Sequence, residues 1–189
     1  MPVHGALLLA AGASRRLGRP KQLVEVDGEP LIRRAARALL ATKPHECVVV
    51  LGHAAAELAA ALDGVPVRCV IARDVEEGMA ASLRVGIAAL DAHCAGALIA
   101  LTDQPALNAA HLHALCAAWR RAPENAVASA YADTLGVPAL LPRRWFADLA
   151  TLAGDVGARE LVRARTHEVV AITADALALD VDTPADLRR

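Results

Sequence analysis

The sequence predicts an α/β fold, in which a mostly parallel sheet carries helices on both faces. Two observations carry this prediction. Short runs of Val, Leu and Ile alternate along the chain with alanine-rich segments of helical spacing, which is typical of a parallel sheet covered on both sides. The first run, residues 3–10, is apolar throughout, as expected of a strand buried on both faces. A length of 189 residues suits one sizeable core, so residues 1–189 are expected to form a single domain.

Taken in order, the segments alternate in a Rossmann-like manner. Strands are expected at residues 3–10, 47–51, 67–71, 97–101, 126–130, around 136–138, and at 169–172 and 177–181. Helices are expected at residues 30–41, 54–62, 79–90, 108–120, 143–149 and 155–165, with a helical turn at 184–189. In the first helix Leu31, Ala35 and Leu39 share one side and arginines the other. Asn108 is predicted to cap its helix, because its side chain can accept from a first-turn amide.

Composition argues against several classes of protein. The net charge is −1 and the pI about 6.6, without the basic surplus of a nucleic-acid binder. No apolar run is long enough for a membrane span, and the start of the chain lacks signal-peptide features. The four cysteines are widely spaced and are expected to be reduced, buried thiols. The histidines show no metal-ligand spacing and are expected at the surface or at caps. We therefore expect a cytoplasmic protein with no nucleic-acid or membrane partner.

A basic loop follows the first strand. In open α/β sheets, ligands bind beyond the carboxyl ends of the strands, which is where residues 11–28 leave the sheet. Gly12 allows close backbone approach, and Arg15, Arg16 and Lys21 can neutralise phosphate oxygens. Neither the P-loop pattern nor the dinucleotide pattern G-x-G-x-x-G is present. The loop predicts a triphosphate cradle; the alternative is a solvated basic loop without a ligand.

Four motifs carry a resemblance to a known family. They read LAAGASRRLGRPKQL, EGMAASLRVGI, LTDQPAL and GDVGAREL. Together they resemble the molybdenum cofactor cytidylyltransferases and the related guanylyltransferases of the NTP transferase superfamily. The resemblance implies a nucleotide-diphospho-sugar transferase-like fold and Mg²⁺- or Mn²⁺-dependent transfer of CMP from CTP to the terminal phosphate of molybdopterin, with release of pyrophosphate. GTP is the alternative nucleotide.

The resemblance also assigns residues to the nucleotide. Arg16, Lys21 and Asp103 are expected to be catalytic. The segment around Gly78 and Ser82 is expected to serve the base, the alternative being an ordinary capped helix start. The expected nucleotide-binding residues are Leu9, Ala10, Ala11, Gly12, Ala13, Ser14, Arg15, Arg16, Lys21, Gly78 and Ser82.

Two carboxylates are candidate metal ligands. Asp103 ends an apolar strand, which places it at the edge of the sheet that the basic loop faces. Mg²⁺ is usually held by one or two carboxylates, and the resemblance implies that Asp103 is one of them. Asp155 is the expected second ligand. The alternatives are a turn or cap role for Asp103 and a helix N-cap role for Asp155.

The acceptor side is less sharply defined. Its expected residues are Gly136, Pro138, Gly154, Asp155 and Arg159. Many relatives carry histidine at the position of Val137, so a sugar phosphate or a polyol phosphate remains an alternative acceptor. Arg159 is expected to meet the acceptor's phosphate, and the alternative is an arginine on the surface of its helix. A third alternative is a non-catalytic carrier of molybdenum cofactor. A molybdenum hydroxylase or its maturation factor is the expected protein partner.

Overall fold

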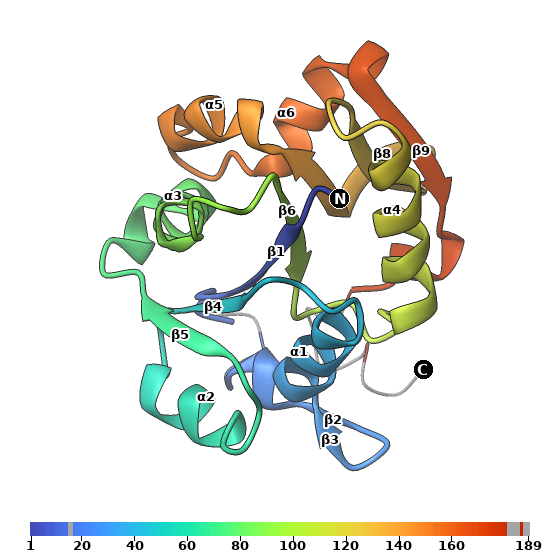
Figure 1. Ribbon diagram of the computed structural model, residues 1–189. Helices are drawn as coiled ribbons and strands as arrows, with labels where there is room; N and C mark the ends of the chain where they lie inside the picture. The colour runs from blue at the N-terminus through green and yellow to red at the C-terminus, as the bar shows by residue number, and fades with distance from the viewer. Residues whose placement is uncertain (15–16, 181–185, 187–189) are drawn as a thin grey trace.

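The computed structural model describes residues 1–14, 17–180 and 186, and its centre is a seven-stranded sheet (Figure 1). The strands are β1 (His4–Ala10), β4 (Cys47–Leu51), β5 (Arg68–Ile71), β6 (Gly96–Leu101), β7 (Ala126–Tyr131), β8 (Thr134–Pro142) and β9 (Val169–Thr173). The helices are α1 (Leu31–Ala41), α2 (Ala55–Ala61), α3 (Met79–Ala89), α4 (Ala109–Arg121), α5 (Phe146–Thr151) and α6 (Ala158–Ala164). A small hairpin of β2 (Glu25–Val26) and β3 (Glu29–Pro30) stands apart from the main sheet.

The sheet is mostly parallel, as predicted. Its strand order is β5-β4-β1-β6-β8-β7-β9, and β5, β4, β1 and β6 run in the same direction. The register pairs Leu9 with Leu101 and Ala10 with Leu51, so the carboxyl ends of these strands meet at one edge. Chain order reverses between β1 and β6, which is where open α/β sheets form ligand crevices. β8 is antiparallel to both of its neighbours.

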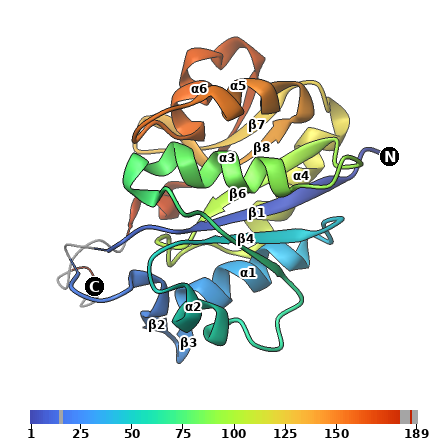
Figure 2. The same cartoon turned by 90° about the vertical axis from the view of Figure 1, so that its left-hand side faces the viewer.

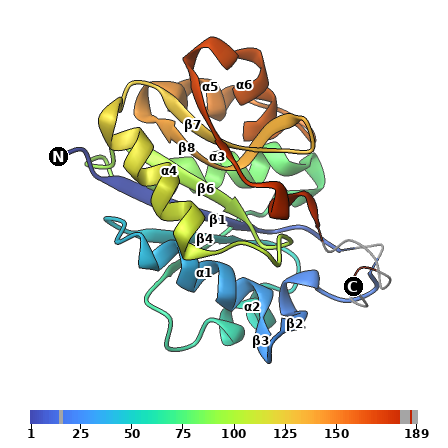
Figure 3. The ribbon, with the colours of Figure 1, turned by 90° about the vertical axis from the view of Figure 1, so that its right-hand side faces the viewer.

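Helices cover both faces of the sheet, as predicted (Figures 2 and 3). Side chains along β1 alternate between the two faces of the sheet. Leu8 belongs to the apolar layer that includes residues of α1, α2 and α4, whereas Leu7 belongs to the layer that includes residues of α3, α5 and α6. On the second face α3 lies very close to the strands, since a Cβ added at Gly86 would fall 2.4 Å from Leu7 Cδ1. The core is therefore two apolar layers separated by the sheet.

Three predicted segments differ from the structure. The expected loop before residues 136–138 is reduced to a tight turn, and β8 extends over nine residues because pairing with both β6 and β7 supports it. The strand expected at 177–181 is wrong: η5 (Asp175–Ala178) is a 3₁₀ helix that buries Leu177. The helix expected from residue 155 begins only at Ala158. Most of the turn expected at 184–189 lies outside the described residues.

Two expectations about His and Cys also need correction. His4 is buried in β1, where its Nε2 lies 2.9 Å from Thr42 Oγ1, and burial lowers its pKa to about 4. Cys47, Cys94 and Cys116 are buried free thiols as expected, but Cys69 is exposed on the edge strand β5. No helix among the described residues is long and apolar enough to cross a membrane.

Candidate functional site

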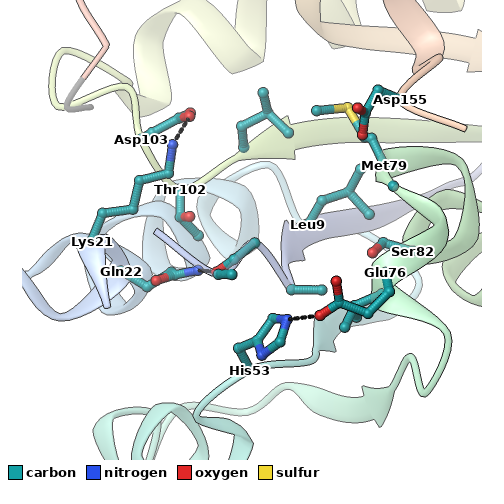
Figure 4. A pocket seen from close by; sticks show the side chains of 16 residues that line it. Leu9, Lys21, Gln22, His53, Glu76, Met79, Ser82, Thr102, Asp103 and Asp155 are labelled. Carbon is teal, nitrogen blue, oxygen red and sulfur yellow. Dashed lines mark hydrogen bonds and ion pairs between the residues drawn. The ribbon is translucent and has the colours of Figure 1, made fainter. Parts of the chain in front are cut away.

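A cavity of about 370 Å³ opens at the carboxyl edge of β1, β4 and β6 (Figure 4). Segments far apart in the sequence meet around it. The lining residues are Leu9, Ala11, Gly12, Ala13, Lys21, Gln22, His53, Val75, Glu76, Gly78, Met79, Ser82, Leu101, Thr102, Asp103 and Asp155. Seven of the predicted nucleotide-binding positions are among them, namely Leu9, Ala11, Gly12, Ala13, Lys21, Gly78 and Ser82. Ala10 is buried in β1 and does not line the cavity.

The basic loop and the strand-end carboxylate meet in this cavity. Lys21 Nζ donates to Asp103 Oδ2 at 2.6 Å, although the two residues are 82 positions apart in the chain. Both side chains are largely shielded, with 18% of Lys21 and 14% of Asp103 exposed. Asp103 is not a helix cap, because the helix that follows is capped by Asn108, whose side chain accepts from His111 N. Arg15 and Arg16 lie outside the described residues.

Gln22 shapes the basic loop from inside. It is only 1% exposed, and its Nε2 donates to the carbonyls of Ala10 and Gly12, each at 2.9 Å. The Lys21 amide donates to Ser14 Oγ at 3.0 Å, which ties the two ends of the turn together. The loop is therefore held in shape by a buried amide side chain that the sequence analysis missed. Its position directly after Lys21, within an otherwise charged or apolar stretch, was the available signal.

Close backbone packing forms the opposite wall. Gly78 precedes α3 with φ +97°, and a Cβ there would lie 2.4 Å from Asp155 Oδ1 and 2.6 Å from the Gly154 carbonyl oxygen. The amide of Ala80 donates to the same carbonyl at 3.1 Å. The two predicted segments are thus in contact, with Asp155 on the cavity wall. Asp155 does not cap α6, since Gly157 occupies the N-cap and its amide donates to Glu160 Oε2.

The carboxylates fit a metal that is bound together with a polyphosphate. Asp103 Oδ1 is buried and has no hydrogen-bond partner among residues 1–14, 17–180 and 186. A buried carboxylate oxygen without a donor suits a hard cation. Within the same described residues, no group of three or more His, Cys, Asp or Glu side chains is placed to hold a metal ion. A cation on Asp103 would therefore be completed by phosphate oxygens and water, as is usual for Mg²⁺, and Asp155, which lines the same cavity, is the second candidate ligand.

Three predicted acceptor residues, Gly136, Pro138 and Arg159, do not line the cavity. Gly136 and Pro138 are buried in β8. A Cβ at Gly136 would lie 2.8 Å from the Tyr131 hydroxyl and 3.5 Å from Arg159 Nε. Arg159 is not a simple surface arginine, because its Nε is buried and has no hydrogen-bond partner in the part of the chain that the structure describes. Burial raises the pKa of Tyr131, which is also near Arg159.

Gln104 joins this region to Asp103. Its Nε2 lies within 3.2–3.3 Å of three acceptors: the Tyr131 hydroxyl and the carbonyls of Val137 and Leu177. Gln104 is 4% exposed, and the Tyr131 hydroxyl donates to the Val137 carbonyl at 2.7 Å. The residue next to Asp103 therefore binds β7, β8 and η5 at once. Sequence reasoning did not single out this role.

Comparison with known proteins identifies the family. The family model described as "MobA-like NTP transferase domain" matches residues 6–170. The chain is 33% identical to nicotine blue oxidoreductase of Paenarthrobacter nicotinovorans, over 100% of this chain and 97% of that protein. It is 30% identical to purine catabolism protein PucB of Bacillus subtilis strain 168, over 95% of this chain and 92% of that protein.

Solved structures agree with this. Rv0371c of Mycobacterium tuberculosis H37Rv superposes with a TM-score of 0.88 at 33% identity, covering 99% of this chain and 97% of that one. Its complex with manganese superposes with a TM-score of 0.83 at 29% identity, covering 99% and 97%. The chain therefore belongs to the MobA-like NTP transferase family and is a nucleotidyltransferase.

Proposed function

We propose that the protein transfers CMP from CTP to the terminal phosphate of a molybdopterin-type acceptor and releases pyrophosphate. The observation that carries this proposal is the Lys21–Asp103 pair at the β1–β6 switch point, in which the second Asp103 oxygen is buried and has no hydrogen-bond partner among the described residues. A cation and a metal-ready carboxylate in one crevice suit a polyphosphate. Nucleotidyl transfer is a displacement at the α-phosphate, so positioning and charge neutralisation are what the protein must supply.

Each predicted residue has a role in this scheme. The Lys21 ammonium lines the cavity beside Asp103, and its positive charge is proposed to attract and hold the triphosphate. Arg16 is proposed to neutralise a further phosphate. The backbone around Gly12 and Ala13 lines the same cavity and would face the triphosphate. Asp103 and Asp155 would hold Mg²⁺ or Mn²⁺, and the ion supplies charge neutralisation at the phosphate oxygens when bound. The manganese complex of the related Rv0371c supports a divalent ion.

The acceptor would lie toward Gly154 and Asp155. Arg159, next to the Gly136–Pro138 segment of β8, is proposed to orient the acceptor's phosphate. The motif resemblance supports molybdopterin as the acceptor and cytosine as the base. We further propose that residues 1–189 act as one domain in the cytoplasm and pass the product to a molybdenum hydroxylase or its maturation factor.

Pyrophosphate release tests the proposal. Purified protein is incubated with Mg²⁺, each of the four NTPs in turn, and molybdenum cofactor. The expected result is stoichiometric pyrophosphate and a cytidylylated pterin with CTP alone. Release with GTP only would correct the base, and no release with any NTP would refute nucleotidyl transfer to this acceptor.

Two specific observations favour other candidates, and the same assay separates them. Val137 favours a sugar phosphate or polyol phosphate as acceptor, which predicts turnover with CTP in the absence of pterin. The relation to nicotine blue oxidoreductase favours a redox activity, which predicts loss of the dye's colour with an added electron donor and no pyrophosphate. A non-catalytic carrier would bind CTP and cofactor and release nothing.

A further inference from the structure

A histidine–glutamate contact lines the cavity on the side away from Lys21 and Asp103. His53 Nε2 lies 3.4 Å from Glu76 Oε1, and both side chains belong to the cavity lining. Figure 4 shows the pair across the cavity from the Lys21–Asp103 pair. His53 follows the carboxyl end of β4, and Glu76 lies in η2 (Val75–Glu77), which follows the adjacent strand β5. The cavity thus has the Lys21–Asp103 pair on its β1–β6 side and the Glu76 carboxylate, in contact with His53, on its β4–β5 side.

Tight packing places His53 at this position. A Cβ at Gly52 would fall 2.6 Å from Val75 Cγ1 and 2.8 Å from the carbonyl oxygen of Ala11. Gly52 therefore lets the β4 turn press against both the basic loop and the segment that carries Glu76. The next residue after His53, Ala54, has φ +57°, a conformation that costs a non-glycine residue free energy. Such strain persists where the surrounding structure imposes it, so the position of His53 is set by the fold.

Charge decides which part of a nucleotide can lie against this pair. The polyphosphate is attracted to Lys21 and is repelled by the Glu76 carboxylate. A nucleoside triphosphate with its phosphates at the β1–β6 side must therefore extend its neutral nucleoside toward the β4–β5 side. An ionised carboxylate only accepts hydrogen bonds, so Glu76 selects a donor group on that nucleoside.

Cytosine and uracil differ in this property. Cytosine carries an amino group on its pairing edge at the position where uracil carries a carbonyl oxygen. The amino group can donate to a carboxylate, whereas the carbonyl oxygen would face it with lone pairs. We propose that Glu76, oriented by His53, recognises the exocyclic amino group of the base and makes the site select CTP over UTP. This inference rests on the proposed function, because it assumes that CTP occupies the cavity.

The test is a comparison of nucleotide affinities in Glu76→Gln. CTP, UTP and dCTP are titrated into the full chain with Mg²⁺ by calorimetry. Wild-type protein is expected to bind CTP about 10- to 100-fold more tightly than UTP, the usual range for one polar contact to a charged group. In Glu76→Gln this ratio is expected to fall below about threefold, because an amide can both donate to uracil and accept from cytosine. His53→Gln is expected to reduce the CTP:UTP ratio partially, because Glu76 would lose the contact with the His53 ring.

Glu77→Gln is the matched control. Glu77 is the neighbour of Glu76 but pairs with Arg84 at 2.6 Å and does not line the cavity, so its CTP:UTP ratio is expected to equal that of the wild type. An unchanged ratio in Glu76→Gln would overturn the inference. A change in the CTP:dCTP ratio alone would also overturn it, since it would assign Glu76 to the ribose.

The failure of the inference and the failure of the proposed function give different results. If wild-type protein forms cytidylylated product but binds CTP and UTP equally, the proposed function stands and the inference falls. If no NTP binds or only GTP binds, the proposed use of CTP fails, and the inference fails with it.

Discussion

Asp103→Asn is the substitution that most directly tests the charged centre of the cavity. The amide keeps the shape of the side chain but removes its charge, so Lys21 loses an ionic partner and the proposed metal ion would lose an anionic ligand. Complete burial of such a pair would make its disruption cost about 3–5 kcal/mol. Because 18% of Lys21 and 14% of Asp103 remain exposed, solvent reduces this cost, and we expect about 1–3 kcal/mol.

The expected effect on catalysis is larger than the effect on folding. Metal-held charge neutralisation contributes several kcal/mol to a transition state of this kind. A loss of about 4 kcal/mol corresponds to a fall of roughly 10³-fold in kcat. CTP binding is expected to weaken much less, because Lys21 and the loop around Gly12 remain. Urea unfolding measures the stability, calorimetry the CTP affinity, and pyrophosphate release the rate.

Two further variants make the result interpretable. Lys21→Met combined with Asp103→Asn is expected to cost about 1 kcal/mol less stability than the sum of the single changes, because the two residues are in contact. Asp148→Asn is the control. It removes a 2.7 Å salt bridge between Asp148 and Arg165, neither of which lines the cavity, so activity is expected to be unchanged. Activity of Asp103→Asn within tenfold of wild type, together with additive stabilities, would refute the reasoning.

Three other experiments test the fold. Gly78→Ala is expected to lower the free energy of unfolding by about 1–3 kcal/mol and to lower kcat/KM, because the added Cβ would collide with Gly154 and Asp155. Gly64→Ala is the control in the same urea and rate measurements: Gly64 has φ +73°, but a Cβ there would have no atom within 4 Å, so this variant reports the backbone strain alone. His4 has a folded pKa of about 4 against 6.5 when unfolded, so the unfolded state takes up the proton first as pH falls. Between pH 6.5 and 4 the wild-type protein is therefore expected to lose about 3 kcal/mol more unfolding free energy than His4→Gln. Urea midpoints that fall equally with pH in the two proteins would contradict this. Burial raises the pKa of Cys47 to about 12, whereas Cys69 is exposed. Iodoacetamide at pH 8 is therefore expected to label Cys69 long before Cys47, which peptide mass spectrometry would measure. Equal labelling rates at the two thiols would be inconsistent with the burial of Cys47.

Local chemistry made much of the fold predictable. The apolar run at Cys47–Leu51 is a strand with the bounds that the sequence predicts, and the helix after Asn108 begins where its side chain caps it. The meeting of Lys21 with Asp103 follows from a general rule: parallel strands end at one edge, so residues just after them gather there. These features depend on periodicity, capping and strand direction, all of which are carried by neighbouring residues.

The tertiary structure decided what no local pattern carries. The nine residues of β8 form a strand because they pair with β6 on one side and β7 on the other. Leu177 is buried in the core, and its carbonyl accepts a hydrogen bond from Gln104. The Glu76–His53 pair and the contact of Gly78 with Asp155 likewise join segments that are distant in the chain. Such contacts depend on how layers of the fold pack, and that packing is set by all the elements together. The sequence alone therefore determined the frame and the gathering of Lys21 and Asp103 at one edge of the sheet, whereas only the folded chain showed that His53 and Glu76 line the same cavity.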